Sequence, residues 1–253
     1  MKKKLGFLVV CLVAVGMSGC SVKISTKTST KSDTTKETVA KKAEHVDYND
    51  QKDWEFSSGK MQSPINIPTS EVKKLTDDSG NMTLHYDTKV SKVENNGHSI
   101  QVADGGQAEI DGRHFTLTQF HFHAASEHTI DGKHYPMEAH FVNTAQDGRI
   151  AVIAVFFEEG AENKGFQEVL EDVSRDQTND ITDLMNMIPT NKSYYHYLGS
   201  LTTPPLNENV EWYVMKNPVE VSATQIASFK KLYAHNNRKI QPLNERAILE
   251  HDE

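Results

Sequence analysis

Short apolar or alternating runs, separated by turn residues, make up most of the chain from about His45 onward. The clearest runs are Phe115–His123, Met137–Val142 and Ile150–Phe157, and such runs are typical of strands. Turn signals recur at Asn95-Asn96-Gly97, Asp104-Gly105-Gly106, Asp111-Gly112, Asp131-Gly132 and Asp147-Gly148. Helical spacing is confined to a few segments, notably Gly165–Asp172 and Ala223–Leu232. The pattern predicts one mainly β domain over residues 45–253, with peripheral helices.

The first 20 residues have a different pattern. Lys2–Lys4 precede an apolar run, Leu5–Val15, which is too short for a bilayer span of about 20 residues. Small residues then lead to Cys20, and Met17 stands where a bacterial lipobox usually has Leu. This ending resembles a lipobox, so we predict a lipoprotein signal peptide over residues 1–19 and a diacylglycerol on Cys20. The alternative is an ordinary secretory signal with an incidental cysteine.

Residues 20–44 are predicted to be a lipidated cysteine followed by a flexible Lys/Ser/Thr tether. The segment has no aromatic residue and no regular apolar spacing, so it cannot bury enough surface to offset the entropy of ordering it. We therefore expect an exported protein, anchored by lipid on the extracytoplasmic side of the cell membrane. If Cys20 is not lipidated, the protein is secreted or periplasmic.

Charge and cysteine content narrow the class of protein further. Residues 1–44 hold nine lysines and three acidic residues, so of the chain's 27 basic and 35 acidic side chains the remainder holds 18 and 32. An acidic body argues against nucleic-acid binding, which depends on neutralising phosphates. The only cysteines are Cys11 and Cys20, so the domain has no intrachain disulfide and its stability must come from its core.

Three histidines have the spacing of a metal site. On a strand, Gln119, His121 and His123 share one face, and on a second strand Glu138 and His140 do the same. Three neutral imidazoles with an open fourth position are typical of a catalytic zinc site, whereas structural sites are closed and usually use thiolates. The alternative for a His-x-His strand is a polar stripe without a metal.

Several further motifs occur in a fixed order. They are Gln62-Ser63-Pro64-Ile65-Asn66-Ile67, Asn95-Asn96-Gly97-His98, Gln119–His123 with Ser126-Glu127-His128, Glu138-x-His140-x-Val142, Gly199–Pro205 running to Trp212, and Asn237-Arg238 with Gln241-Pro242-Leu243. With these motifs the chain resembles an α-class carbonic anhydrase from about His45 to Arg246. The resemblance implies an α+β fold on a large, mostly antiparallel twisted central sheet. It also implies a carbonate dehydratase, which reversibly hydrates carbon dioxide to bicarbonate and a proton.

The resemblance assigns roles to the metal site and its surroundings. His121, His123 and His140 hold Zn²⁺, whose bound hydroxide attacks CO₂. Their partners are the side chains of Gln119 and Glu138 and the backbone carbonyl of Asn236. Strand alternation independently supports the first two pairings. His128 is expected to be a buried, hydrogen-bonded residue rather than a ligand.

The resemblance also implies how substrate and proton are handled. Thr202 accepts a hydrogen bond from the nucleophile and donates one to an ionised Glu127, while Thr203 contacts bicarbonate. His98 is the proton shuttle, as suits an imidazole with an ordinary pKa of about 6.5. The residues that order its relay waters are Tyr48, Asn96 and Gln101. The apolar wall beside CO₂ consists of Val142, Val152, Leu201, Val210 and Trp212. Sulfonamides are expected to inhibit.

The chain departs from the family pattern in two places. Many bacterial members have one disulfide, but here Phe56-Ser57-Ser58 and Leu206 occupy the corresponding regions. The entry segment is short, with Val46 in place of a usual Trp, which weakens the assignment of Tyr48. Competing hypotheses are a zinc-capturing surface lipoprotein, a catalytically inactive relative and a cupin-type metal enzyme. The oligomeric state, the turnover and the physiological role stay open.

Overall fold

The structure is a computed structural model that describes residues 46–54, 59–75 and 80–253. The predicted signal peptide, Cys20 and the tether lie outside the described residues, as does Phe56-Ser57-Ser58. None of the helices in the described ranges has the length and apolarity that a membrane crossing requires.

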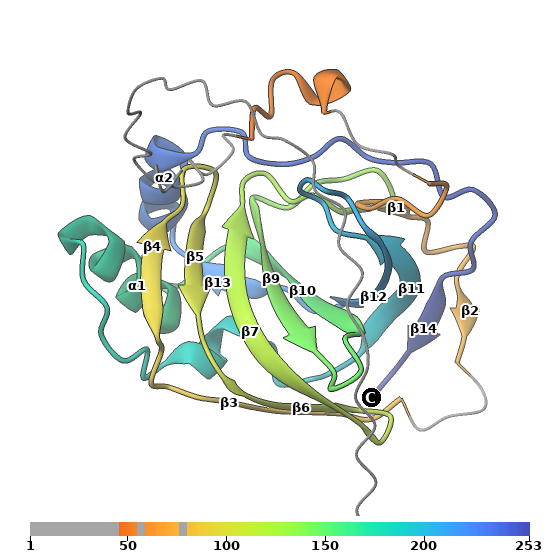
Figure 1. The fold of residues 1–253 in the computed structure, drawn as a ribbon, viewed down its shortest axis with the longest axis horizontal. Helices are drawn as coiled ribbons and strands as arrows, with labels where there is room; N and C mark the ends of the chain where they lie inside the picture. The colour runs from red at the N-terminus through yellow and green to blue at the C-terminus, as the bar shows by residue number, and fades with distance from the viewer. Residues whose placement is uncertain (1–45, 55–58, 76–79) are drawn as a thin grey trace, which may run out of the picture. The chain divides into compact units, whose positions relative to one another are not determined.

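A 12-stranded sheet dominates the described part of the chain (Figure 1). Its strands are β2 (Lys73–Lys74), β3 (Met82–Tyr86), β4 (Lys92–Asn95), β5 (Ile100–Ala103), β6 (Gly106–Ile110), β7 (Arg113–His123), β9 (Met137–Thr144), β10 (Ile150–Glu159), β11 (Tyr194–Ser200), β12 (Glu208–Met215), β13 (Val219–Val221) and β14 (Leu249–His251). The order is β2-β14-β11-β12-β10-β9-β7-β5-β4, with β13 on β10 and β6 between β3 and β7. A separate two-stranded sheet pairs β1 (Asn66–Ile67) with β8 (Thr129–Ile130).

Most neighbouring strands of the large sheet run antiparallel, as predicted. The parallel pairs are β10 with β12, β10 with β13, and β14 with β2. A two-residue turn at Asp111-Gly112 joins β6 to β7, and both residues have positive φ, 50° and 68°. A hairpin loop of this kind matches the right-handed twist of its strands, and glycine adopts positive φ without steric cost.

The two faces of the sheet bury different residues. One face presents Phe120, Phe122, Phe141 and Phe157, all with no exposed surface, to a core that includes Phe166. The ring of Phe122 lies 4.8 Å from that of Phe166, centroid to centroid. Truncating such a buried ring typically costs about 3–5 kcal/mol. This packing therefore fixes β7, whose alternate residues on the opposite face are the candidate metal ligands.

Two helices lie beside the β4 end of the sheet (Figure 1): α1 (Lys164–Arg175) and α2 (Ala223–Leu232). Asn163 caps α1 by accepting from the backbone N–H of Phe166, and Ser222 and Gln225 form a capping box on α2. The side chain of Gln225 also donates to the carbonyl of Asn163 at 2.7 Å. The two helix starts are thereby tied together. Two 3₁₀ turns, Gln51–Asp53 and Leu184–Met187, complete the helical content of the described residues.

Candidate metal centre and active site

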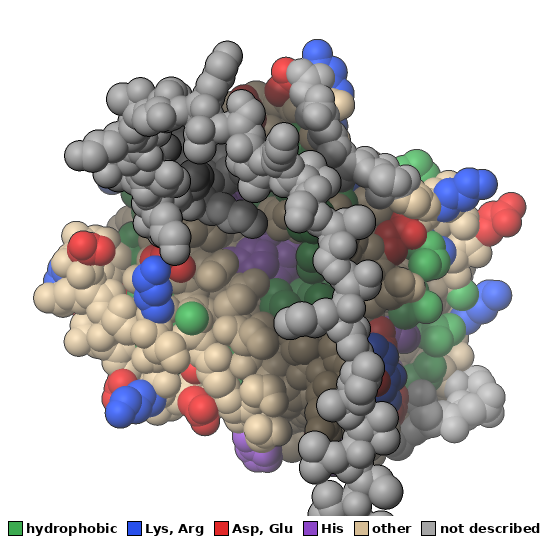
Figure 2. Space-filling model, viewed as in Figure 1, with side chains coloured by type: hydrophobic (Ala, Val, Ile, Leu, Met, Phe, Trp, Pro, Cys, Tyr) green, Lys and Arg blue, Asp and Glu red, His purple; other side chains and the backbone are tan. Residues whose placement is uncertain are grey.

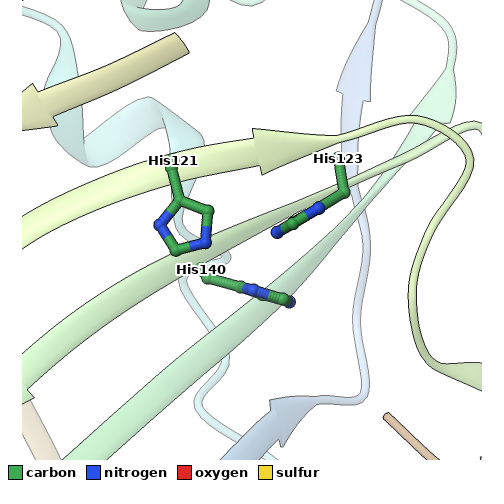
Figure 3. Close-up of side chains that lie close together, drawn as sticks. All are labelled: His121, His123 and His140. Atoms are coloured by element: carbon green, nitrogen blue, oxygen red, sulfur yellow. The ribbon is translucent and has the colours of Figure 1, made fainter. Parts of the chain in front are cut away.

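Strand register brings the three histidines together. In the β7–β9 pair His121 lies opposite His140, and in the β5–β7 pair Gln101 lies opposite His121. His123 is two residues further along β7, on the same face. The rings face one another (Figure 3), with centroids 5.0 Å apart for His121 and His123, 5.2 Å for His121 and His140, and 4.5 Å for His123 and His140.

Each ring uses one nitrogen to bind a protein oxygen. His121 donates from Nδ1 to Gln119 Oε1 at 2.8 Å, and His140 donates from Nε2 to Glu138 Oε1 at 2.8 Å. His123 donates from Nδ1 to the carbonyl oxygen of Asn236 at 2.6 Å. These are the three contacts expected from the sequence. They fix the orientation of each ring, which is what metal-ligating histidines require.

The remaining nitrogens are Nε2 of His121, Nε2 of His123 and Nδ1 of His140. Each of the three residues offers one ligand atom, and these atoms lie within 4.8 Å of one another. Nε2 of His123 is buried and has no hydrogen-bond partner among the described residues. A buried imidazole nitrogen left without a proton donor is costly unless something binds it. The donor set fits a divalent cation that prefers imidazole.

Burial sets the charge state of these groups. It lowers the pKa of His121 well below 6.5, and the neighbouring His123 and His140 lower it further. Burial also lowers the pKa of His123. Burial alone would raise the pKa of Glu138, but the charges and hydrogen bonds of His128 and His140 lower it well below its usual range. At neutral pH His121 and His123 are therefore neutral and Glu138 is ionised, the charge states that metal binding favours.

Glu127 and Thr202 are both buried, and the Glu127 carboxylate lies beside His123 and His140. Glu127 has no exposed surface, and its Oε1 accepts from the backbone N–H of Arg238 at 2.6 Å. Its Oε2 lies 3.9 Å from His140 Nδ1 and has no hydrogen-bond partner within the described residues. The backbone N–H of Arg238 thus holds one oxygen of this carboxylate, while the other has no hydrogen bond from the Thr202 hydroxyl in this structure.

The expected relay residues line one cavity together with two of the three candidate ligands, His121 and His123. It has a volume of about 60 Å³, enough for a few waters, and its lining comprises Tyr48, Asn96, His98, Ser99, Gln101, Gln119, His121, His123 and Thr203. An outer hollow of about 330 Å³ is also lined by Tyr48 and His98. His98 therefore lies between the ligand cavity and the outer hollow. The hydroxyl of Tyr48 is buried without a partner among the described residues, and burial raises its pKa.

The apolar residues named from the sequence lie on neighbouring strands. Val152 of β10 is opposite Val142 of β9 and Trp212 of β12, and Leu201 and Val210 belong to the same hydrophobic cluster. The Trp212 ring lies 4.9 Å from that of His140. Figure 2 shows histidine side chains in a hollow of this face, with hydrophobic side chains beside them. An apolar wall therefore reaches the metal centre.

Several supporting hydrogen bonds were not predicted from the sequence. The side chain of Asn236 donates to the carbonyls of His98 and Phe122 and accepts from the N–H of Ala124. His128 is buried, as expected, and it links Glu138 to the hydroxyl of Tyr197 at 2.7 and 2.6 Å. These contacts join segments far apart in the chain, so no local spacing could reveal them.

The fold and the site define a sheet protein with three imidazoles arranged as a candidate metal centre. The family model for eukaryotic-type carbonic anhydrase matches residues 49–252. A carbonic anhydrase of Pectobacterium carotovorum is 42% identical over 200 residues, covering 76% of this chain and 80% of the relative. Carbonic anhydrase 1 of Oryctolagus cuniculus is 32% identical over 232 residues, covering 75% and 98%.

Solved structures of carbonic anhydrases resemble this chain as well. An α-carbonic anhydrase from Thermovibrio ammonificans, in complex with the inhibitor sulfanilamide, has a TM-score of 0.71 and 44% identity over 76% of this chain and 87% of its own. A carbonic anhydrase from Chlamydomonas reinhardtii, in complex with acetazolamide, has a TM-score of 0.68 and 33% identity over 76% and 91%. The chain belongs to the eukaryotic-type, or α-class, carbonic anhydrase family. Its enzyme class is carbonate dehydratase.

Proposed function

We propose that this protein hydrates carbon dioxide reversibly at a zinc ion held by His121, His123 and His140. The observation that carries the proposal is that each histidine binds a protein oxygen through one ring nitrogen. The second nitrogen of each ring stays available, and these three nitrogens lie close together. They gather beside the apolar cluster of Val152 and Trp212. CO₂ is apolar, so this cluster offers it a dry surface next to the metal centre.

When bound, zinc supplies a hydroxide nucleophile at neutral pH, because it lowers the pKa of water to about 7, a magnitude established for carbonic anhydrases rather than deduced from this chain. Within this scheme the Thr202 hydroxyl orients the nucleophile and donates its own proton in a hydrogen bond to Glu127. Oε2 of Glu127 has the free acceptor capacity that this contact needs.

His98 is proposed to carry the released proton outward. The imidazole lines both the ligand cavity and the outer hollow, and imidazoles change charge near neutral pH. Tyr48, Asn96 and Gln101 line the inner cavity, where their polar groups can order waters between the metal centre and His98. Thr203 lines it too, in a position to contact bicarbonate.

Sulfonamide inhibition is proposed on the strength of the relatives. The Thermovibrio ammonificans enzyme is described in complex with sulfanilamide and the Chlamydomonas reinhardtii enzyme in complex with acetazolamide. An ionised sulfonamide nitrogen would occupy the open position among the three imidazoles.

One set of measurements tests the proposal. Stopped-flow CO₂ hydration by zinc-loaded protein should be fast, blocked by acetazolamide, and lost in His121→Ala while circular dichroism shows a folded protein. His114→Ala is a matched control, because His114 is an exposed histidine elsewhere on β7, and it should keep full activity. Hydration no faster than buffer by zinc-loaded wild type would refute the proposal and leave a zinc-capturing protein as the alternative.

Export and lipid anchoring are a separate proposal that rests on Lys2–Lys4, Leu5–Val15 and Cys20. Two acyl chains suffice for stable membrane attachment. Metabolic labelling with an alkyne fatty acid should label the wild type and not Cys20→Ser, and the variant should leave the membrane fraction. Unlabelled, soluble wild-type protein would instead indicate an ordinary secretory signal.

A further inference from the structure

Gln62 is a buried amide that uses both ends of its side chain. The residue is 4% exposed. Its Nε2 donates to Glu208 Oε1 at 3.0 Å and to the carbonyl of Leu206 at 3.3 Å. Its Oε1 accepts from Arg238 Nη1 at 2.8 Å and from Ser200 Oγ at 3.4 Å. Donor and acceptor ends therefore face different parts of the molecule, and only one orientation of the amide satisfies both.

The donor end faces the hairpin between β11 and β12, two strands that lie next to each other in Figure 1. This hairpin carries Thr202 and Thr203 and is closed at its base by Leu201 N–H donating to the carbonyl of Asn207 at 2.9 Å. Oε1 of Glu208, at the start of β12, accepts from Gln62 and also from the backbone N–H of Met61 at 2.7 Å.

The same segment also binds the other side of the hairpin. The N–H of Ser63 donates to Ser200 Oγ at 2.9 Å, and the N–H of Ser200 donates to Ser63 Oγ at 3.1 Å. Met61–Ser63 therefore binds the last residue of β11 and the first residue of β12. Both ends of the hairpin that bears Thr202 are held by one segment.

The acceptor end of Gln62 leads to Glu127. Arg238 donates from Nη1 to Gln62 Oε1 and to the carbonyl of Ser63, the latter at 2.6 Å. The backbone N–H of the same arginine donates to Glu127 Oε1 at 2.6 Å. A continuous series of hydrogen bonds thus runs from Glu208 through Gln62 and Arg238 to the buried carboxylate of Glu127.

We propose that Gln62 and Glu208 form a positioning pair that sets the Thr202 hairpin at a fixed place relative to Glu127. Neither member of the pair lines the ligand cavity, so the pair can affect the reaction only through Thr202 and Glu127. The inference therefore rests on the proposed roles of those two residues. The pair acts through geometry, because a displacement of about 1 Å in such a site can cost about a hundredfold in rate.

Gly59 shows how closely the Glu208 carboxylate is confined. A Cβ atom at Gly59 would lie 2.3 Å from Glu208 Oε2 and 2.5 Å from Oε1. No side chain fits there unless the carboxylate moves away from Met61 and Gln62. Gly59→Ala is therefore a second way to disturb the pair without touching either of its members.

The decisive experiment reverses the two side chains. Gln62→Glu replaces the donating –NH₂ with an oxygen that faces Glu208 and the carbonyl of Leu206, so we expect kcat/KM for CO₂ hydration to fall by about tenfold or more. Glu208→Gln in the same protein restores a donor and an acceptor between the two positions. The double variant should recover part of the lost kcat/KM, because the Met61 N–H and the Leu206 carbonyl still face like groups. If the loss in Gln62→Glu were merely structural, Glu208→Gln would instead lower kcat/KM further.

Glu220→Gln is the matched control. Glu220 also accepts from a backbone N–H, that of Ala161, at 3.0 Å, and its carboxylate lies against Gly160, but it is on β13, away from the hairpin. This variant should keep the wild-type kcat/KM and should give no rescue of Gln62→Glu. Zinc content and circular dichroism are measured for every variant.

Two results overturn the positioning pair. One is a folded, zinc-loaded Gln62→Glu protein with wild-type kcat/KM. The other is a double variant no better than Gln62→Glu alone. If Gln62→Glu does not fold, Gly59→Ala and Glu208→Ala must each lower kcat/KM and weaken acetazolamide binding at full zinc content, and unchanged values refute the pair. Inactive wild-type protein would refute the proposed function instead, and the double-variant comparison is then made on acetazolamide affinity.

Discussion

The side chain of Asn236 donates a hydrogen bond to the backbone carbonyl of His98, with a nitrogen–oxygen distance of 3.0 Å. The backbone carbonyl of the same asparagine accepts from Nδ1 of His123 at 2.6 Å. One buried residue, 1% exposed, thus orients a candidate metal ligand and holds the turn that carries the proposed shuttle. Asn236 therefore ties the position of His98 to that of His123.

Asn236→Ala should destabilise the protein by about 2–4 kcal/mol. The change removes the partner of the Ala124 N–H, the bond to the His98 carbonyl and one of two donors to the Phe122 carbonyl, which keeps Ser99 Oγ. A buried group left unpaired costs about 1–3 kcal/mol. Urea unfolding measures the loss. Asn217→Ala, at an exposed position, should stay within about 0.5 kcal/mol of wild type. An equally small effect at Asn236 would show that its side chain does not hold the site together.

His98→Ala should lower kcat in weak buffer by at least about tenfold, because positioned proton transfer contributes about 10²–10⁴-fold. kcat/KM should be unchanged, since CO₂ reaches the metal centre as before. Added imidazole should restore kcat by replacing the missing ring, and the test is stopped-flow hydration across a series of buffer concentrations. Undiminished turnover at low buffer would remove His98 from the proton path.

The local part of the site could be predicted from the sequence. Alternation along a strand places Gln119 beside His121 and Glu138 beside His140, because residues two apart share a face, and the structure has both hydrogen bonds. The helix predicted at Ala223–Leu232 has those bounds in the structure, while Gly165–Asp172 extends to Lys164–Arg175. Hydrophobic periodicity predicts a helix or strand well when that element buries only one of its faces.

The long-range part could not be predicted in the same way. The register that sets His121 opposite His140 depends on a strand pairing, and the bond from Arg238 to Gln62 joins residues 176 positions apart. Nothing in the local pattern at Gln62 distinguishes a buried bridging amide from an exposed one. The hydrogen bond from the backbone N–H of Arg238 to Glu127 was not predicted for the same reason, because the two residues are 111 positions apart.

Glu138→Gln should weaken zinc binding by about 10–100-fold, the usual cost of removing a hydrogen-bond partner of a ligand. The carboxylate accepts from His140 through Oε1 and from the backbone N–H of His128 through Oε2. In the glutamine variant the amide –NH₂ faces either the His140 ring N–H or the His128 backbone N–H, and two donors cannot form a hydrogen bond. Competition with a chelating dye measures the affinity, and Glu109→Gln, on the exposed side of β6, is the control. Unchanged zinc affinity would show that Glu138 does not support the metal site.

Asp104, between β5 and β6, gives the stability an unusual pH dependence. It is 8% exposed; Oδ1 accepts from the Gly105 N–H at 2.7 Å, while Oδ2 is buried with no partner among the described residues. Burial raises its pKa from 3.8 to about 6, against the lowering effect of the Gly105 N–H and with a further rise from the charge of Asp87. The folded protein therefore binds this proton more tightly than the unfolded chain.

A raised pKa in an acidic group means that the protonated form favours folding. This contribution is fully present below about pH 4 and is lost as the pH rises through about 6. Asp104→Asn should thus be more stable than wild type by about 1 kcal/mol at pH 7.5, and the difference should shrink toward pH 4. Denaturant unfolding at several pH values measures the difference in free energy of unfolding between the variant and the wild type. The contribution of histidine titration is the same in both proteins and cancels in this difference.

Asp147→Asn tests the sign, because the hydrogen bonds of Arg149 lower the pKa of Asp147 rather than raising it. Its substitution should leave stability unchanged or slightly reduced at pH 7.5. If Asp104→Asn is destabilising at pH 7.5, or if its effect does not change between pH 4 and 7.5, the carboxyl of Asp104 is not the strained group that its burial and its unpartnered Oδ2 indicate.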